Sequence, residues 1–126
     1  MIDERMKLLA GQRLVAGFEG YTVPESFQQL IRDCKIGNVI LFRRNIESAD
    51  QMRRLCGEIR EFILRETGIP PFIIIDEEGG MVSRLPKDAV NVPGAMAVAA
   101  TGDPENARLA SQITIRQLRG LGANFN

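Results

Sequence analysis

Short apolar runs alternate along the chain with longer stretches in which hydrophobic residues recur at helical spacing. Apolar runs rich in β-branched residues favour extended backbone, and they predict strands over residues 13–18, 38–42, 72–76 and from 123 onward. The second and third runs are almost continuously apolar, as expected for strands of a parallel sheet covered on both faces. The pattern therefore predicts a series of βα units.

Four helices are predicted around these strands, over residues 3–12, from about 22 to 35, from 48 to 67 and from 103 to about 120. Residues 22–25 and 48–51 are interpreted as capping boxes, and Asp103 followed by Pro104 is a typical helix start. Residues 81–102 are predicted as a loop that contains Pro86, Pro93 and Gly94. The third helix has one apolar face, made by Met52, Leu55, Ile59, Phe62 and Ile63.

The predicted fold class is α/β, with about four parallel strands and intervening helices. A TIM-type (β/α)8 barrel needs ~250 residues, so this chain of 126 residues corresponds to about half of one. An open doubly wound sheet is the alternative, but the Gly-x-Gly-x-x-Gly turn that follows its first strand is absent. We therefore expect residues 1–126 to form a partial barrel domain, truncated within the fourth strand. Because a half barrel leaves two sheet edges unpaired, the folded chain is expected to form a homo-oligomer.

Charge and hydropathy narrow the range of partners. The chain has 16 Lys and Arg against 16 Asp and Glu, which offers no electrostatic basis for binding nucleic acid or an anionic membrane. No apolar run approaches the ~20 residues that a membrane-spanning helix needs. The first residues include acids where a secretory signal would carry bases and then an apolar core, so we expect a cytoplasmic location.

The counts of histidine and cysteine limit the chemistry further. Histidine is absent, which excludes Ser-His-Asp and Cys-His catalysis and histidine-based metal sites within these residues. Cys34 and Cys56 are too few and too far apart for a zinc site or a disulfide framework, and both are predicted to be buried structural thiols. The groups that remain available for chemistry are carboxylates, arginine, lysine, tyrosine and the backbone.

The strongest candidate site follows the third predicted strand, at Asp76, Glu77 and Glu78, with Gly79 and Gly80 directly behind. In parallel α/β folds the active site forms at the carboxyl ends of the strands, and clustered acids there need partners or a ligand. Asp76 and Glu78, ~6.6 Å apart along a strand, would suit a general acid/base pair. A magnesium or calcium site and a purely structural role are the alternatives. In the structural role, the acids would pair with nearby arginines, namely Arg43, Arg44 and Arg84.

Residues 75–85, Ile-Asp-Glu-Glu-Gly-Gly-Met-Val-Ser-Arg-Leu, resemble the Asp-x-Glu-Gly-Gly-Arg-Val-x-Arg signature of glycoside hydrolase family 3. Residues 37–46 resemble the second strand and loop of that family, and residues 120–126 resemble the start of its fourth strand. The bacterial β-N-acetylglucosaminidases, or β-N-acetylhexosaminidases, are the most similar branch. One departure is Met81, which stands where the family has arginine.

The resemblance implies a TIM-type barrel in which Asp76 hydrogen-bonds the sugar of the −1 subsite and Arg84 also contacts the substrate. A salt bridge to a neighbouring acid is the other reading of Arg84. By the same resemblance the chain is the N-terminal half of the barrel, and Glu77 and Glu78 hold the loop or orient Arg84, with direct ligand contact as the alternative and a catalytic role for neither. The resemblance requires no metal or organic cofactor, and it implies an N-acetylglucosamine-containing saccharide as the ligand.

In the family, the aspartate nucleophile, a Lys-His pair and the histidine acid/base lie beyond the equivalent of Asn126. Because a retaining mechanism needs a nucleophile and a proton donor, we expect this chain alone to be inactive. The intact parent is expected to remove terminal β-linked N-acetylglucosamine, in cell-wall recycling. A β-glucosidase or β-xylosidase parent, and a non-enzymatic self-associating fragment, are the alternatives.

Overall fold

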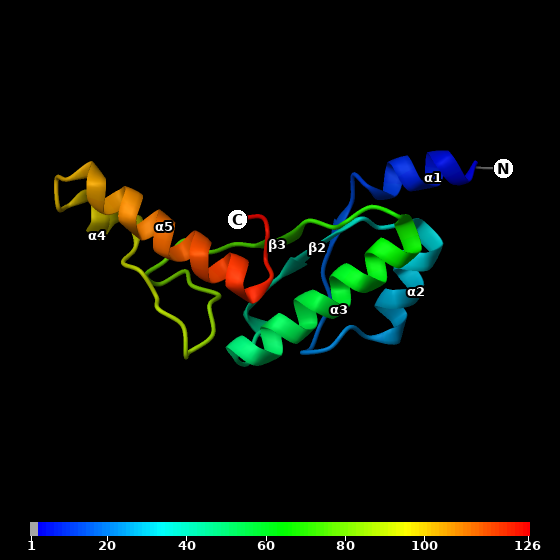
Figure 1. Cartoon of the computed structure of the whole chain (residues 1–126), viewed down its shortest axis with the longest axis horizontal. Coiled ribbons are helices and arrows are strands. Elements are labelled where there is room, and N and C mark those ends of the chain that lie inside the picture. Colours follow the sequence, from blue (N-terminus) through cyan, green and yellow to red (C-terminus); the bar gives the residue numbers. More distant parts are fainter. Residues whose placement is uncertain (1–2) are drawn as a thin grey trace.

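The computed structural model describes residues 3–126 and is shown in Figure 1. Helices and strands alternate along most of the chain, in agreement with the predicted βα units. The elements are α1 (Glu4–Gly11), β1 (Val15–Ala16), α2 (Glu25–Cys34), β2 (Asn38–Leu41), the 3-10 turn η1 (Arg43–Asn45), α3 (Ala49–Thr67), β3 (Ile73–Ile75), α4 (Ala95–Ala99) and α5 (Pro104–Leu121).

The three strands form a parallel sheet in the order β1-β2-β3. A fourth strand was predicted from residue 123 onward, and the described residues contain only a single parallel bridge there, between Ile74 and Phe125. Residues 124–126 still lie beside β3, because the backbone N–H of Ile75 donates to the carbonyl of Phe125 at 3.0 Å. The prediction of about four strands is thus corrected to three strands and one bridged segment.

The hydrophobic core lies between the sheet and helices α2, α3 and α5. Alternate residues of the central strands, among them Val39, Leu41, Ile73 and Ile75, are buried against these helices. The apolar face predicted for α3 is confirmed, since its five residues are all buried. In Figure 1, α2 and α3 lie side by side beneath the sheet, whereas α4 and the start of α5 project away from it.

Helix starts were predicted with mixed success. The hydroxyl of Ser48 accepts a hydrogen bond from the N–H of Gln51, and the carboxylate of Asp103 accepts one from Glu105, so both N-caps are confirmed. Only half of the capping box predicted at residues 48–51 forms, because Oε1 of Gln51 accepts from the N–H of Glu47 and not from that of Ser48. The capping box at residues 22–25 is wrong, because Pro24 occupies the N-cap of α2 and no side chain caps that helix. Helix α4 lies inside the segment predicted as a loop.

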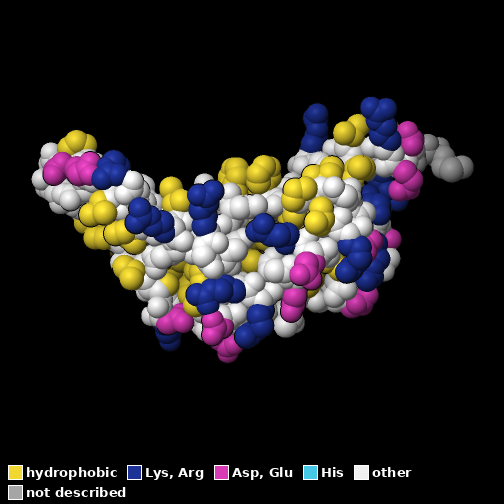
Figure 2. All heavy atoms as spheres, in the orientation of Figure 1, with side chains coloured by type: hydrophobic (Ala, Val, Ile, Leu, Met, Phe, Trp, Pro, Cys, Tyr) yellow, Lys and Arg dark blue, Asp and Glu magenta, His cyan; other side chains and the backbone are white. Residues whose placement is uncertain are grey.

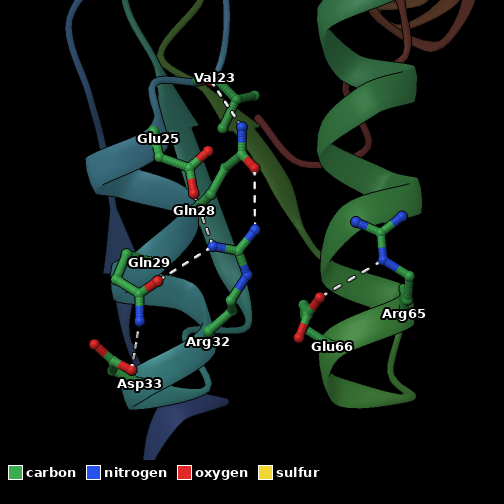
Figure 3. A network of polar contacts seen from close by, with 8 residues as sticks. All are labelled: Val23, Glu25, Gln28, Gln29, Arg32, Asp33, Arg65 and Glu66. Atoms are coloured by element: carbon green, nitrogen blue, oxygen red, sulfur yellow. Dashed lines mark hydrogen bonds and ion pairs between the residues drawn. The ribbon is translucent and has the colours of Figure 1, made fainter.

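Arginine side chains also connect α2 to α3. The guanidinium of Arg32 donates to Glu25 at 2.9 Å and to Gln29 at 3.2 Å along α2, as Figure 3 shows. The same guanidinium lies 5.2 Å from the ring centroid of Phe62 on α3, and that of Arg65 lies 4.9 Å from it. Phe62 therefore packs against two cations, which links the polar surface of α2 to the core of the molecule.

The two cysteines differ in environment. Cys56 is buried, as predicted, and desolvation raises the pKa of its thiol to about 12. Cys34, at the end of α2, is exposed. The prediction of a buried structural thiol is therefore wrong for Cys34, because this position of α2 turns away from the sheet.

The sheet face opposite the helices remains open. We call it the inner face, and its exposed or half-buried apolar residues are Val15, Ile40, Phe72, Ile74 and Phe125. Phe72 and Phe125 are 54% and 51% exposed and meet edge to face, with their ring centroids 5.5 Å apart. Among residues 3–126, no helix is long and apolar enough to cross a membrane.

Candidate functional site

The three consecutive acids lie where β3 ends and the chain reverses direction. Strand β3 stops at Ile75, and Glu78 already belongs to a tight hairpin, in which its N–H donates to the carbonyl of Val82 at 3.0 Å. Gly79 and Gly80 form the turn with φ angles of 77° and 59°. Residues other than glycine adopt such angles at a cost, so the glycine pair predicted to let the backbone turn has that function.

The hairpin packs closely on the segment that leads into α4. The N–H of Gly80 donates to the carbonyl of Val92 at 2.8 Å. A Cβ added to Gly80 would lie 2.8 Å from the backbone nitrogen of Gly94. This contact leaves no room for a side chain at Gly80, and it fixes the hairpin relative to the projecting α4–α5 region.

Asp76 and Arg84 are brought together at the surface. The Nη2 atom of Arg84 lies 3.9 Å from Oδ2 of Asp76, and the two side chains are 26% and 56% exposed, respectively. At that distance the pair is a loose ion pair that leaves most hydrogen-bonding positions of both groups free. The Nε–H of Arg84 is buried and has no hydrogen-bond partner in the structure. A guanidinium and a carboxylate so arranged offer both donors and acceptors to a polyhydroxylated ligand.

Glu77 and Glu78 differ sharply in environment. The Glu77 carboxylate is buried beneath the loop and accepts hydrogen bonds from four groups between residues 79 and 85. Glu78 is exposed, and no side-chain hydrogen bond or ion pair is recorded for it within residues 3–126. Of these two carboxylates, it is that of Glu77 that contacts the loop.

The end of β2 approaches the same loop. The Nη1 atom of Arg43 donates to the carbonyl of Leu85 at 2.8 Å. Arg44 turns the other way, where its Nε lies 2.8 Å from a carboxylate oxygen of Glu19. Three arginines were considered as partners of the acids at residues 76–78. In the described part of the chain, Arg84 alone forms an ion pair with one of these acids, Asp76.

Two side-chain amides tie the ends of neighbouring strands together. Buried Asn45 donates to the carbonyls of Phe18 and Gly20 at 3.0 and 2.9 Å and accepts from the N–H of Phe42 at 2.9 Å. Asn126 exchanges two hydrogen bonds with the backbone of Glu77. No role was predicted for either asparagine from the sequence, where the only signal is their position at the carboxyl end of an apolar run.

The alternatives for the acid triplet receive less support. The acid/base pair required extended backbone as far as Glu78, whereas β3 ends at Ile75 and Glu78 starts the hairpin. No group of three or more Cys, Asp or Glu residues within 3–126 is placed to bind a metal ion.

A groove of about 650 Å³ opens beside this loop, between the end of β3 and helices α4 and α5. Its wall includes Glu78, Asn126, Val98 and Ile115, but neither Asp76 nor Arg84. Figure 2 shows hydrophobic side chains over the same α4–α5 region, where Met96, Leu109 and Ile115 are exposed. The groove therefore flanks the Asp76–Arg84 pair and is a separate feature.

Several known proteins are similar to this chain in sequence or in structure. A solved glycoside hydrolase family 3 β-N-acetylglucosaminidase from Paenibacillus sp. matches 94% of this chain, with 39% identity and a TM-score of 0.90. Beta-hexosaminidase A of Pseudoalteromonas piscicida is 33% identical over 111 residues, 83% of this chain. NagZ from Neisseria gonorrhoeae, solved in complex with N-trifluoroacetyl-D-glucosamine, matches 87% of this chain at 26% identity and a TM-score of 0.70.

These relatives are much longer than the present chain, which spans 23%, 18% and 33% of their respective lengths. The similarity to solved structures covers 94% of this chain in the Paenibacillus enzyme and 87% in NagZ, and it supports a TIM-type α/β architecture. The sequence model of the Glycosyl hydrolase family 3 N terminal domain matches residues 1–126. The chain belongs to glycoside hydrolase family 3, through the N-terminal domain of that family.

Proposed function

We propose that this chain supplies the sugar-binding part of a retaining β-N-acetylhexosaminidase, in which Asp76 and Arg84 hold the terminal N-acetylglucosamine. The observation that carries the proposal is the partly exposed Asp76–Arg84 pair at the carboxyl end of β3. A carboxylate accepts hydrogen bonds from sugar hydroxyls, and a guanidinium donates to hydroxyl or carbonyl oxygens. Two of the matched relatives are a β-N-acetylglucosaminidase and a protein crystallised with a glucosamine derivative.

On this proposal, the chain does not supply the catalytic groups that retaining hydrolysis requires. That mechanism needs a carboxylate nucleophile and a proton donor on either side of the glycosidic bond. Glu77 is buried under the loop, and the proposal assigns Asp76 to holding the sugar together with Arg84, so neither carboxylate is assigned as the nucleophile. On this proposal the nucleophile and the acid/base come from polypeptide beyond residues 1–126, and the 126 residues alone bind sugar without cleaving it.

A chimaera tests this directly. Residues 1–126 would replace the matching segment of the Paenibacillus relative, and hydrolysis of 4-nitrophenyl N-acetyl-β-D-glucosaminide would be measured. The chimaera is expected to be active, and Asp76→Ala within it should lower kcat/KM about 100-fold, as expected for loss of a charged hydrogen-bonding group. Glu61→Gln, at an exposed residue of α3, is the control and should leave kcat/KM within about twofold.

Two results would contradict the proposal. Full activity of the Asp76→Ala chimaera would remove Asp76 from the sugar site. A chimaera that cleaves the corresponding glucoside or xyloside in preference to the N-acetylglucosaminide would favour the β-glucosidase or β-xylosidase alternative. Circular dichroism of each variant would separate loss of binding from loss of folding.

We further propose a cytoplasmic location and a role in recycling cell-wall sugars. Support comes from the similarity to bacterial hexosaminidases. Fractionation of cells that express the natural gene, with assay of N-acetylglucosamine release from cell-wall fragments, tests both statements.

A second candidate function is self-association, and the inner face favours it. Phe72 and Phe125 expose about half of their surface there, and no charged side chain lies within β1, β2 or β3. The outer edges at Val15 and Phe125 are free to pair with another strand. A second copy related by a two-fold axis would cover both inner faces and pair both edges.

A further inference from the structure

The backbone of Glu77 is held by Asn126, which lies across the open side of β3. The N–H of Glu77 donates to Oδ1 of Asn126 at 2.9 Å, and the Nδ2 of Asn126 donates to the carbonyl of Glu77 at 3.0 Å. One side-chain amide thus satisfies both backbone groups of one residue, as a paired strand would. Glu77 is therefore fixed in place immediately after β3 ends.

From this fixed position the Glu77 side chain organises the following loop. Its Oε1 accepts from the N–H of Gly79 at 3.1 Å. Its Oε2 accepts from the N–H of Arg84 at 2.6 Å, from the N–H of Leu85 at 3.2 Å and from the hydroxyl of Ser83 at 3.2 Å. The residue is only 5% exposed. Four donors converge on one buried carboxylate, and all four are neutral.

These contacts restrain the backbone of the loop. No lysine or arginine in residues 3–126 forms an ion pair with Glu77, so its charge is balanced by oriented N–H and O–H dipoles. Charged acceptors form stronger hydrogen bonds than neutral ones. The two ends of the loop, at Gly79 and Leu85, are consequently held to a single side chain.

A second charged group holds the same loop from the other side. While the N–H of Leu85 donates to Glu77, its carbonyl accepts from Nη1 of Arg43 at 2.8 Å. The residue directly before it is Arg84, whose own N–H makes the shortest of the Glu77 contacts. The backbone on either side of the Arg84 side chain is thus restrained by β3 through Glu77 and by the end of β2 through Arg43.

We propose that Glu77 is a positioning residue that sets the location of the Arg84 guanidinium opposite Asp76, with Arg43 as the supporting contact. This inference rests on the proposed sugar site for its functional meaning. Arg84 and Asp76 meet at 3.9 Å, so rotation of the 84–85 backbone would carry the guanidinium away from the carboxylate and from a sugar that both side chains contact. Glu77 itself contacts no ligand.

The test uses the 126-residue chain and N-acetylglucosamine as the probe. Glu77→Gln keeps the size of the side chain but replaces one acceptor with an NH2 group that would face backbone N–H donors. Glu61→Gln, the same substitution at an exposed residue of α3, is the control. Nuclear magnetic resonance would follow the amide exchange of residues 79, 84 and 85, the Nε–H signal of Arg84 and the shifts caused by N-acetylglucosamine.

The expected result is that Glu77→Gln speeds amide exchange at Arg84 and Leu85 at least 10-fold, moves the Arg84 Nε–H signal and weakens N-acetylglucosamine binding at least 10-fold. Exchange of core amides in β2 should stay unchanged, which separates local positioning from general loss of stability. Arg43→Gln should produce the same changes to a smaller extent.

The outcomes separate this inference from the proposed function. If the unsubstituted chain shows no N-acetylglucosamine shifts while Glu77→Gln still displaces Arg84, the sugar site fails and the positioning contact stands. If Glu77→Gln leaves the Arg84 signals and the sugar affinity as they are in the unsubstituted chain, the positioning role is wrong. Equal loss of protection in β2 and in the loop would also overturn it, because Glu77 would then be only a stability determinant.

Discussion

Gly122 lies directly against Cys56, and this contact fixes the distance between the end of α5 and the middle of α3. A Cβ added to Gly122 would stand 2.5 Å from the Cβ of Cys56. Gly122 also has a φ of 98°, in the left-handed region, where it caps α5. Both the helix end and the helix contact therefore require glycine at this position.

Gly122→Ala should destabilise the chain by about 2–4 kcal/mol, because it combines a left-handed backbone penalty with overpacking against α3. Gly120→Ala is the matched control. Gly120 lies within α5 with no atom near its would-be Cβ, so alanine there should be neutral or stabilising by up to about 1 kcal/mol. Urea unfolding of the two variants measures the difference, and equal midpoints would contradict the close contact.

Much of the helix arrangement could be predicted from the residue pattern, because it depends on contacts between residues that are close in sequence. Ser48 and Asp103 cap helices through bonds within three residues of themselves, and the spacing of Met52, Leu55 and Ile59 determines which side of α3 is buried. The short helix α4 was missed because its sequence, Ala-Met-Ala-Val-Ala, has no polar start and no buried residue. The close approach of Gly122 to α3 depends on tertiary packing, which no local pattern reports.

Asn45 should be one of the most sensitive polar residues in the chain. It is fully buried, and its side chain satisfies the carbonyls of Phe18 and Gly20 and the N–H of Phe42. Asn45→Ala would leave these backbone groups without partners, at a cost of about 3 kcal/mol. Asn106→Ala, at an exposed asparagine, should change the free energy of unfolding by less than about 0.5 kcal/mol. Similar values for both variants, by urea unfolding, would show that water replaces the Asn45 contacts.

Some residues of the candidate site could be predicted from the sequence, and others could not. Asp76 and Arg84 were identified from a signature that is contiguous in sequence, and the fold places them within 3.9 Å. Arg43 and Asn126 contact the loop from 42 and 49 residues away in sequence. Their contribution depends on strand order and register, so the polar runs after each strand indicated a site without indicating which side chains would reach the loop.

The two thiols should differ in reactivity. Cys34 is exposed and should react at once with a disulfide reagent at pH 8, whereas Cys56 should react only after unfolding, because burial raises the pKa of its thiol to about 12. Counting modified thiols in native and denatured chain measures this. Cys34→Ser should abolish the fast phase alone, and rapid modification of two thiols in the native chain would contradict the buried position of Cys56.

The same pKa shift predicts how stability changes with pH. The unfolded thiol loses its proton near its ordinary value of 9.0, while the folded thiol keeps it up to about pH 12. In that interval the folded state binds more protons, so the free energy of unfolding should fall as pH rises. Cys56→Ala should show a shallower fall between pH 9 and 12. Parallel curves for the two proteins in urea unfolding would exclude the thiol as the cause.

The inner face leads to a prediction about assembly that also tests the half-barrel architecture. Phe72 and Phe125 form an exposed aromatic pair there, beside an open sheet edge. Burial of apolar surface of this kind drives association, so sedimentation velocity at micromolar concentration should show a dimer or larger species. Phe72→Lys would place a charge in the contact and should raise the dissociation constant of the dimer at least 10-fold.

The control is Leu64→Lys. It changes an exposed apolar residue of α3, on the helix side of the sheet, and should leave association unchanged. A monomeric, cooperatively folded chain would instead show that the open edge and the inner face are stable in water, which would remove self-association as a candidate function.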